Sequence, residues 1–162
     1  MAALQNILVP LDGSPPSLAA LEHAVALAED SGATIDVLHI EALPVGSMSA
    51  LSPDLRQELE RAVERAQARI GPRVSRRSAS GDPVVKIIEI ASEGQYDLIV
   101  MGTHGRVGRL HAMLGSVAEA VIRNAPCPVL TVRETGGGYQ SFAERRHGRP
   151  SVAEQPAPHH HR

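Results

Sequence analysis

The sequence predicts an α/β protein, a doubly wound sheet of five parallel strands with helices on both faces. Five short strand-like runs alternate along the chain with four segments of helical pattern, which is typical of this class. The runs 7–11 and 98–101 are apolar throughout, as expected for strands that are buried on both faces. Parallel strands require crossovers, and right-handed crossovers favour a sheet that is wound in both directions.

In the N-terminal half, the pattern predicts a buried strand over 7–11 and a helix over 15–31 that a glycine closes. A second strand is expected over 34–40. After a loop rich in serine, a helix is predicted over 53–70, because its apolar residues recur at helical spacing and its other face is charged. The polar segment 74–80 is expected to form an edge strand.

In the C-terminal half, Asp82 is expected to cap a third helix that starts at Pro83. A short apolar run over 98–101 predicts the fourth strand. The last helix is expected over 116–124 and the fifth strand over 128–132. These elements complete one domain, and nothing in the pattern indicates a second.

The chain is expected to divide into a folded domain over 1–134 and a flexible, disordered C-terminal tail over 135–162. The tail opens with Gly136-Gly-Gly138, contains several prolines and charged residues, and has Val152 as its one large aliphatic residue. Such a segment cannot bury enough apolar surface to order itself.

Composition narrows the class of protein further. The 162 residues carry a formal net charge of -2, which argues against nucleic-acid binding. No apolar run approaches the roughly 18 residues that a membrane helix needs, so membrane insertion is not expected. There is no signal-peptide pattern. The one cysteine, Cys127, cannot form an intramolecular disulfide and is expected to pack as a small apolar residue. These features favour a cytoplasmic protein.

A glycine-spaced loop after the fourth strand is the strongest functional signal. Gly102, Gly105 and Gly115 precede Ser116, where the last helix is expected to start. A strand, a glycine-rich loop and a helix start together form a common cradle for phosphate. Ligands of doubly wound sheets bind at the carboxyl ends of the strands where the winding reverses, so Asp12 would face this loop.

Several of these residues have a second interpretation. The glycines could simply permit a tight connection, and Asp12 could cap the first helix. His104 could act as a general acid or base, or could contact phosphate or solvent. Arg106 and Arg109 could contact phosphate or remain in solvent. His39, which ends the second strand, is expected to be packed or hydrogen-bonded rather than catalytic.

The sequence resembles the universal stress protein family, in the branch that binds ATP. The resemblance covers about residues 4–133 and rests on several motifs in order. These motifs are Ile7-Leu-Val-Pro-Leu-Asp-Gly-Ser14, Asp97-Leu-Ile-Val-Met-Gly-Thr-His-Gly-Arg106, Leu114-Gly-Ser-Val117 and Cys127-Pro-Val-Leu-Thr-Val-Arg133. In that family the spacing Gly-x2-Gly-x9-Gly-Ser/Thr accompanies ATP binding, and all four of its residues are present here.

The resemblance implies a Rossmann-like sheet of the adenine nucleotide alpha hydrolase type, with strand order 3-2-1-4-5 and the nucleotide between strands one and four. Adenine and ribose would contact the ends of strands one, two and four, and the glycine loop would hold the phosphates. The implied cofactor-binding residues are Pro10, Leu11, Asp12, Ile40, Met101, Gly102, His104, Gly105, Arg106, Gly115, Ser116 and Val117. The ligand would be ATP, or ADP or AMP, with Mg²⁺ accompanying a triphosphate.

The resemblance further implies a stress-response regulator that changes conformation with the nucleotide, binds an unknown protein partner and forms a homodimer through the strand at 128–133. The glycine loop contains no lysine, and Lys86 lies on a predicted helix. No base accompanies a nucleophile in the loop, so no catalytic residue is assigned and efficient turnover is not expected. A slow ATPase or autophosphorylating protein, and an interaction module without nucleotide, remain as alternatives.

Overall fold

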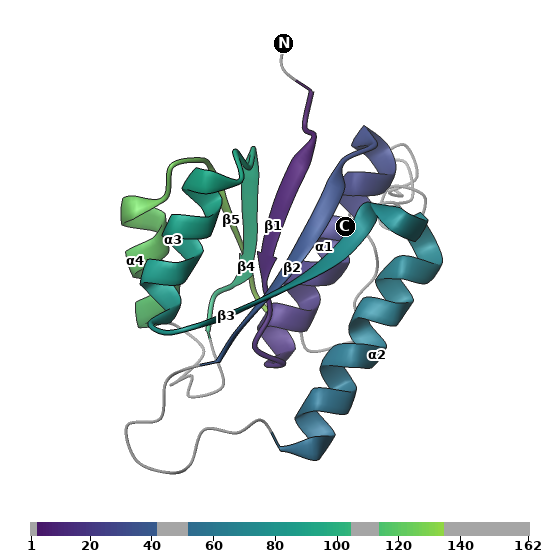
Figure 1. Cartoon of the computed structure of the whole chain (residues 1–162), viewed down its shortest axis with the longest axis horizontal. Coiled ribbons are helices and arrows are strands. Elements are labelled where there is room, and N and C mark those ends of the chain that lie inside the picture. Colours follow the sequence, from purple (N-terminus) through teal and green to yellow (C-terminus); the bar gives the residue numbers. More distant parts are fainter. Residues whose placement is uncertain (1–2, 42–51, 105–113, 135–162) are drawn as a thin grey trace, which may run out of the picture.

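A parallel sheet of five strands forms the centre of the protein, in the order β3-β2-β1-β4-β5 (Figure 1). The computed structural model describes residues 3–41, 52–104 and 114–134. The strands are β1 (Asn6–Pro10), β2 (Thr34–Glu41), β3 (Val74–Ser80), β4 (Leu98–Gly102) and β5 (Val129–Val132). The helices are α1 (Pro15–Ser31), α2 (Pro53–Ile70), α3 (Pro83–Glu93) and α4 (Ser116–Asn124). The expected fold class and strand order are confirmed.

The helices cover the two faces of the sheet in pairs, α1 with α2 on one face and α3 with α4 on the other (Figure 1). Side chains alternate along the strands, so that Ile7 and Val9 pack toward α1 and α2 while Leu8 packs toward α3 and α4. Both cores are almost wholly aliphatic, and Tyr96 is the aromatic residue buried in the second. This alternation decides which residues at the strand ends share a face.

Each of the first three helices begins with a side-chain cap and a proline. Ser14, Ser52 and Asp82 accept hydrogen bonds from backbone N–H groups of the first turns of α1, α2 and α3. Proline follows each cap, where its missing N–H costs nothing. At the other end of α1, Gly32 has a φ of 79°, the left-handed conformation that ends many helices.

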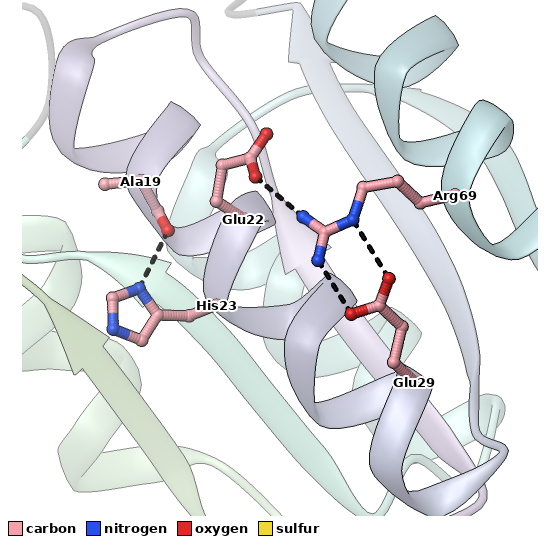
Figure 2. Close-up of polar contacts among 5 residues, drawn as sticks. All are labelled: Ala19, Glu22, His23, Glu29 and Arg69. Carbon is pink, nitrogen blue, oxygen red and sulfur yellow. Dashed lines mark hydrogen bonds and ion pairs between the residues drawn. The ribbon is translucent and has the colours of Figure 1, made fainter. Parts of the chain in front are cut away.

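An ion-pair cluster joins α1 to α2 on their outer surface (Figure 2). The guanidinium of Arg69 donates to Glu29 through two nitrogens, at 2.7 and 3.0 Å, and to Glu22 at 3.1 Å. In the same view, the imidazole Nδ1 of His23 lies 3.1 Å from the carbonyl oxygen of Ala19. Bidentate geometry makes this Arg69 contact more specific than a single surface ion pair.

The observed strand boundaries differ from the expected ones by at most one residue at each end, and those of β3 are the same. β1 ends at Pro10, although the Leu11 N–H still donates to the Leu38 carbonyl at 2.9 Å, and β5 starts one residue after Pro128, which has no N–H to give to a ladder. A short 3-10 helix over Gly71–Arg73, which the pattern did not predict, links α2 to β3. The edge position of β3 is confirmed. The expected tail over 135–162 lies outside the described residues.

Candidate functional site

Three segments meet at the carboxyl ends of the two central strands, β1 and β4. They are the loop 11–14 after β1, residues 102–104 at the end of β4, and residues 115–117 at the start of α4. The Ser14 hydroxyl lies 3.4 Å from the His104 carbonyl oxygen, and the Gly115 N–H donates to the Thr103 carbonyl at 2.7 Å. The strand order reverses direction at this point of the sheet, where ligands of such folds bind.

Asp12 and Ser14 form a bonded pair on one side of this junction. The Asp12 carboxylate accepts from the Ser14 N–H at 2.9 Å and from the Ser14 hydroxyl at 2.5 Å. Ser14 in turn accepts from the Ser17 N–H at 3.4 Å and is the N-cap of α1. The interpretation of Asp12 as the cap is therefore wrong. A hydroxyl has a single proton, so the short Asp12 contact takes it and the longer His104 contact is weak.

The predicted site residues divide between the two faces of the sheet. Ile40, Met101 and Val117 pack in the layer under α3 and α4, and Pro10 shares that face by strand alternation with Leu8. Leu11 does not join them: its side chain is 3% exposed and belongs to the core under α1 and α2. Sequence reasoning missed this division, which the parity of β1 could have indicated.

Gly102 is fixed by packing between β4 and α1. A Cβ atom at this position would lie 2.7 Å from the carbonyl carbon of Pro16 and 2.8 Å from the Ser17 nitrogen. Both are backbone atoms that cannot move aside cheaply. At this one position, therefore, the close approach of two elements accounts for the glycine without any ligand.

Thr103 and His104 form a second polar pair, which sequence reasoning also missed. The Thr103 hydroxyl lies 2.8 Å from His104 Nδ1, and the Thr103 N–H donates to the Val132 carbonyl. Thr103 is buried, with 6% of its surface exposed. His104 Nε2 is buried and has no hydrogen-bond partner in the part of the chain that the structure describes. A buried polar atom of this kind is normally satisfied by water or by a ligand.

The start of α4 differs from the other helix starts. Its N-cap is Gly115, with φ -66° and ψ 152°, and no side chain caps the helix among the described residues. Ser116 is exposed and Val117 is half-buried. The first-turn N–H groups and the helix dipole therefore present partial positive charge to the junction. Gly105, Arg106 and Arg109, which the sequence also indicates for this loop, lie outside the described residues.

Charged groups near the junction are few in the described ranges. Lys86, the one lysine, is held on α3 by Glu89 at 2.7 Å. No group of three or more His, Cys, Asp or Glu residues that could hold a metal ion occurs in the described chain. Mg²⁺ bound with a nucleotide commonly takes only one or two carboxylates in addition to phosphate oxygens and water, so Asp12 alone would suit it.

His39 and Cys127, which the sequence singles out, are packed residues. His39 Nδ1 lies 3.2 Å from the Leu11 carbonyl oxygen, so the expectation of a hydrogen-bonded histidine is confirmed. Cys127 packs against the layer under α3 and α4, and burial raises the pKa of its thiol. A raised pKa lowers the thiolate fraction, which fits a packed residue rather than a reactive one.

The fold and the junction define a doubly wound α/β protein whose candidate ligand site lies at the switch point between β1 and β4. The chain belongs to the universal stress protein family, whose family model matches residues 3–133. A universal stress protein of Methanocaldococcus jannaschii is 37% identical over 140 residues, which cover 80% of this chain and 82% of that protein.

Solved structures of the same family share the fold. Universal stress protein UspA from Lactobacillus plantarum is 26% identical with a TM-score of 0.71, and the match covers 82% of this chain and 100% of that one. A universal stress protein in complex with cAMP is 29% identical with a TM-score of 0.64, over 83% of this chain and 100% of that one. In the described part of this chain, no helix is both long and apolar enough to span a membrane.

Proposed function

We propose that this protein binds an adenine nucleotide at the junction of β1, β4 and α4, and that ATP with Mg²⁺ is the ligand in the cell. The observation that carries the proposal is the uncapped start of α4 at the point where the strand order reverses. The relative solved in complex with cAMP supports the adenine nucleotide class.

The chemistry of the residues fits the parts of such a ligand. The apolar groups of Pro10, Ile40 and Met101 suit adenine and ribose, and the N–H groups of Ser116 and Val117 suit phosphate oxygens, since the Gly115 N–H already donates to Thr103. His104 Nε2, buried and without a partner in the described chain, suits a polar group of the ligand. Bound Mg²⁺ would neutralise phosphate charge beside Asp12. Leu11, Gly102, Gly105 and Arg106 belong to the same proposed set, although Leu11 and Gly102 also have packing roles.

The proposed role is regulation by nucleotide binding in the cytoplasm, with a protein partner that senses the bound state. Efficient turnover needs a positioned nucleophile, a base and strong compensation of phosphate charge. The Thr103 hydroxyl contacts the His104 imidazole, but the residue is buried, and Lys86 is paired with Glu89 on α3. These features favour binding over catalysis.

We further propose that two copies pair through the strand at 128–133. β5 is an edge strand in which Leu130 is 38% exposed, and Ile122 on the neighbouring α4 is 45% exposed. The opposite edge, β3, carries Arg76 and Arg77, whose charges discourage strand pairing. The apolar edge is therefore the better candidate for association.

The nucleotide proposal is tested on the full chain in two steps. First, the purified protein is denatured and the released small molecules are identified by mass spectrometry. Second, ATP, ADP, AMP and cAMP are titrated by calorimetry against wild type, Gly115→Ala and Ser116→Ala. The φ and ψ of Gly115 are open to alanine, so a weaker affinity would come from the added methyl group at the phosphate.

Ser92→Ala is the matched control, because Ser92 is also exposed but lies on α3. We expect the two variants at the start of α4 to lose about tenfold or more in ATP affinity and the control to match wild type. Absence of a released nucleotide together with no affinity for any of the four would overturn the proposal. Turnover well above background that Gly115→Ala abolishes would favour the ATPase alternative.

A further inference from the structure

A cavity of about 190 Å³ lies on the face of the sheet that α1 and α2 cover, whereas Ile40, Met101 and Val117 of the proposed nucleotide site pack on the other face. It is open to solvent on one side and is bordered by α2 and by β2 and β3 near their carboxyl ends. Val37 and His39 line it from β2, whereas Leu38 and Ile40, which alternate with them, pack toward α3 and α4. The cavity therefore shares only Leu11 with the proposed nucleotide set, and its other lining residues lie outside that set.

The floor of the cavity is apolar. Leu11, Val37, Leu59 and Val63 line it, and none of them is more than 9% exposed. These side chains come from the loop after β1, from β2 and from α2, so packing of three elements fixes their positions. Such a floor suits a branched aliphatic group, because removing its apolar surface from water favours binding.

The walls of the cavity carry unpaired charges of both signs. Arg56 and Glu60 line it from α2, Arg76 from β3 and Glu41 from β2. None of the four forms an ion pair with another described residue. Their formal charges cancel, so a simple anion or cation would meet repulsion as well as attraction. A molecule that carries both charges can pair with both kinds of side chain.

Two neighbouring arginines, unlike Arg56 and Arg76, have side-chain partners. Arg69, further along α2, is fully engaged by two glutamates of α1. Arg77 also borders the cavity, but its guanidinium donates to the Tyr96 hydroxyl at 3.0 Å, in the layer under α3 and α4. Arg56 and Arg76 are thus the two guanidinium groups at the cavity that remain for a ligand.

His39 adds a polar atom at the boundary of the cavity. Its Nδ1 lies 3.2 Å from the Leu11 carbonyl oxygen, which can only accept, so Nδ1 carries the proton. In the neutral ring, Nε2 then has a lone pair. Nε2 is buried and has no partner in the described ranges. An N–H donor of a ligand would satisfy it after a small rotation of the ring.

We propose that this cavity binds a small zwitterion with an aliphatic side chain, of the size of one free amino acid. Its carboxylate pairs with Arg56 and Arg76, its ammonium group with Glu60 or Glu41 and with His39 Nε2, and its side chain covers the apolar floor. Apart from Leu11, the site uses residues outside the proposed nucleotide set, and it does not depend on the nucleotide proposal.

Three probes that share one branched chain test the proposal on the full protein by calorimetry. L-leucine has both charges, 4-methylpentanoate keeps only the carboxylate, and 3-methylbutylamine keeps only the amine. We expect leucine to bind about tenfold or more tightly than either of the others. Equal affinity for leucine and one single-charge probe, or no binding of leucine up to about 10 mM, would overturn the proposal.

Paired variants locate the binding. Arg76→Gln and Glu60→Gln remove one charge of each sign from the cavity wall, whereas Arg61→Gln and Glu64→Gln remove the same charges from exposed positions of α2 that do not line it. We expect the first pair to weaken leucine binding at least about fivefold and the second pair to match wild type. Equal effects of the two pairs would contradict the proposed site. ATP titrations of the same samples separate a failure here from a failure of the nucleotide site.

Discussion

At the scale of single residues, the surroundings of Tyr96 raise the pKa of its hydroxyl. Its hydroxyl donates to Asp36 on β2 and accepts from Arg77 on β3, and Tyr96 is 7% exposed. Burial is the largest cause of its raised pKa, followed by the hydrogen bond to Asp36. The folded state therefore holds this proton more tightly than the unfolded chain does.

The raised pKa of Tyr96 predicts a loss of stability in alkali. Its contribution is fully present below the pKa of an unfolded tyrosine, about 10, and is lost as the pH rises through the higher folded value. Urea unfolding at a series of pH values should show wild type losing stability above about pH 10 more steeply than Tyr96→Phe. At neutral pH the variant should be less stable by about 1 kcal/mol. Parallel curves for the two proteins would contradict this.

Asp97 predicts the opposite dependence in acid. Its carboxylate accepts from the backbone N–H groups of Asn6 and Gln5, at 2.8 and 2.9 Å, and these bonds lower its pKa. Its stabilising contribution is present above the usual carboxyl pKa, about 4, and is lost as the pH falls through the lower folded value. As the pH is lowered from neutral into the acid range, the midpoint temperature of thermal unfolding should fall more steeply for wild type than for Asp97→Asn. If the unfolding temperature of Asp97→Asn falls as steeply with pH as that of wild type, the Asp97 carboxylate does not have this stabilising role.

Sequence reasoning was least successful at this scale. It identified Asp12 as a residue of the junction, but it could not decide between ligand contact and helix capping. The structure gives the cap to Ser14, and the Asp12 carboxylate accepts from that residue. The hydrogen bond between Tyr96 and Asp36 could not be predicted either, because the two residues are 60 positions apart in the chain. Contacts between side chains depend on register, which a sequence pattern does not give.

At the scale of elements, Gly102 predicts a stability effect that is independent of ligand. A methyl group there would press on the backbone of Pro16 and Ser17 at 2.7 and 2.8 Å, and would push β4 away from the start of α1. Gly102→Ala should lower the free energy of unfolding by about 1–3 kcal/mol in the absence of nucleotide. Unchanged stability in urea, with only nucleotide affinity lost, would show that the ligand rather than packing requires this glycine.

The caps of α1 and α2 offer a matched pair of variants. Ser14 and Ser52 are both N-cap serines followed by proline, but only Ser14 contacts Asp12 and lies at the junction. Ser14→Ala and Ser52→Ala should each destabilise the protein by about 1 kcal/mol. On the proposed function, only Ser14→Ala should also weaken ATP binding, because it removes the hydroxyl bond to the Asp12 carboxylate and leaves the bond from the backbone N–H. Equal ATP affinity of the two variants would contradict a positioning role for Ser14.

The helices were the elements that the sequence predicted best. α1, α2 and α4 have the expected boundaries, because capping residues, prolines and glycines mark them locally. The ends of β1 and β5 were less certain, since neighbouring strands decide where a ladder stops. The cavity under α2 was not foreseen at all. It depends on how α2 sits over β2 and β3, which no local pattern encodes.

At the scale of the whole molecule, the two edges of the sheet differ in their readiness to associate. β3 exposes arginines and serines, whereas β5 exposes Leu130, and Ile122 of the adjacent α4 is exposed as well. An unpaired strand edge with apolar groups tends to find a partner strand, and a second copy of the chain supplies one through a two-fold axis. Pairing of β5 with its counterpart would extend the sheet across both copies.

The proposed dimer predicts that charge on β5 separates the copies. Leu130→Arg would place two like charges close together at the centre of the paired edge, where they cannot be solvated as they are in a monomer. Val85→Arg is the matched control, because Val85 is an exposed apolar residue of α3 and does not belong to this edge. In sedimentation at micromolar concentration, wild type and Val85→Arg should run as dimers and Leu130→Arg as a monomer with unchanged circular dichroism. A wild-type monomer, or a Leu130→Arg dimer, would exclude this interface, and the leucine and ATP titrations would then report on sites contained within one chain.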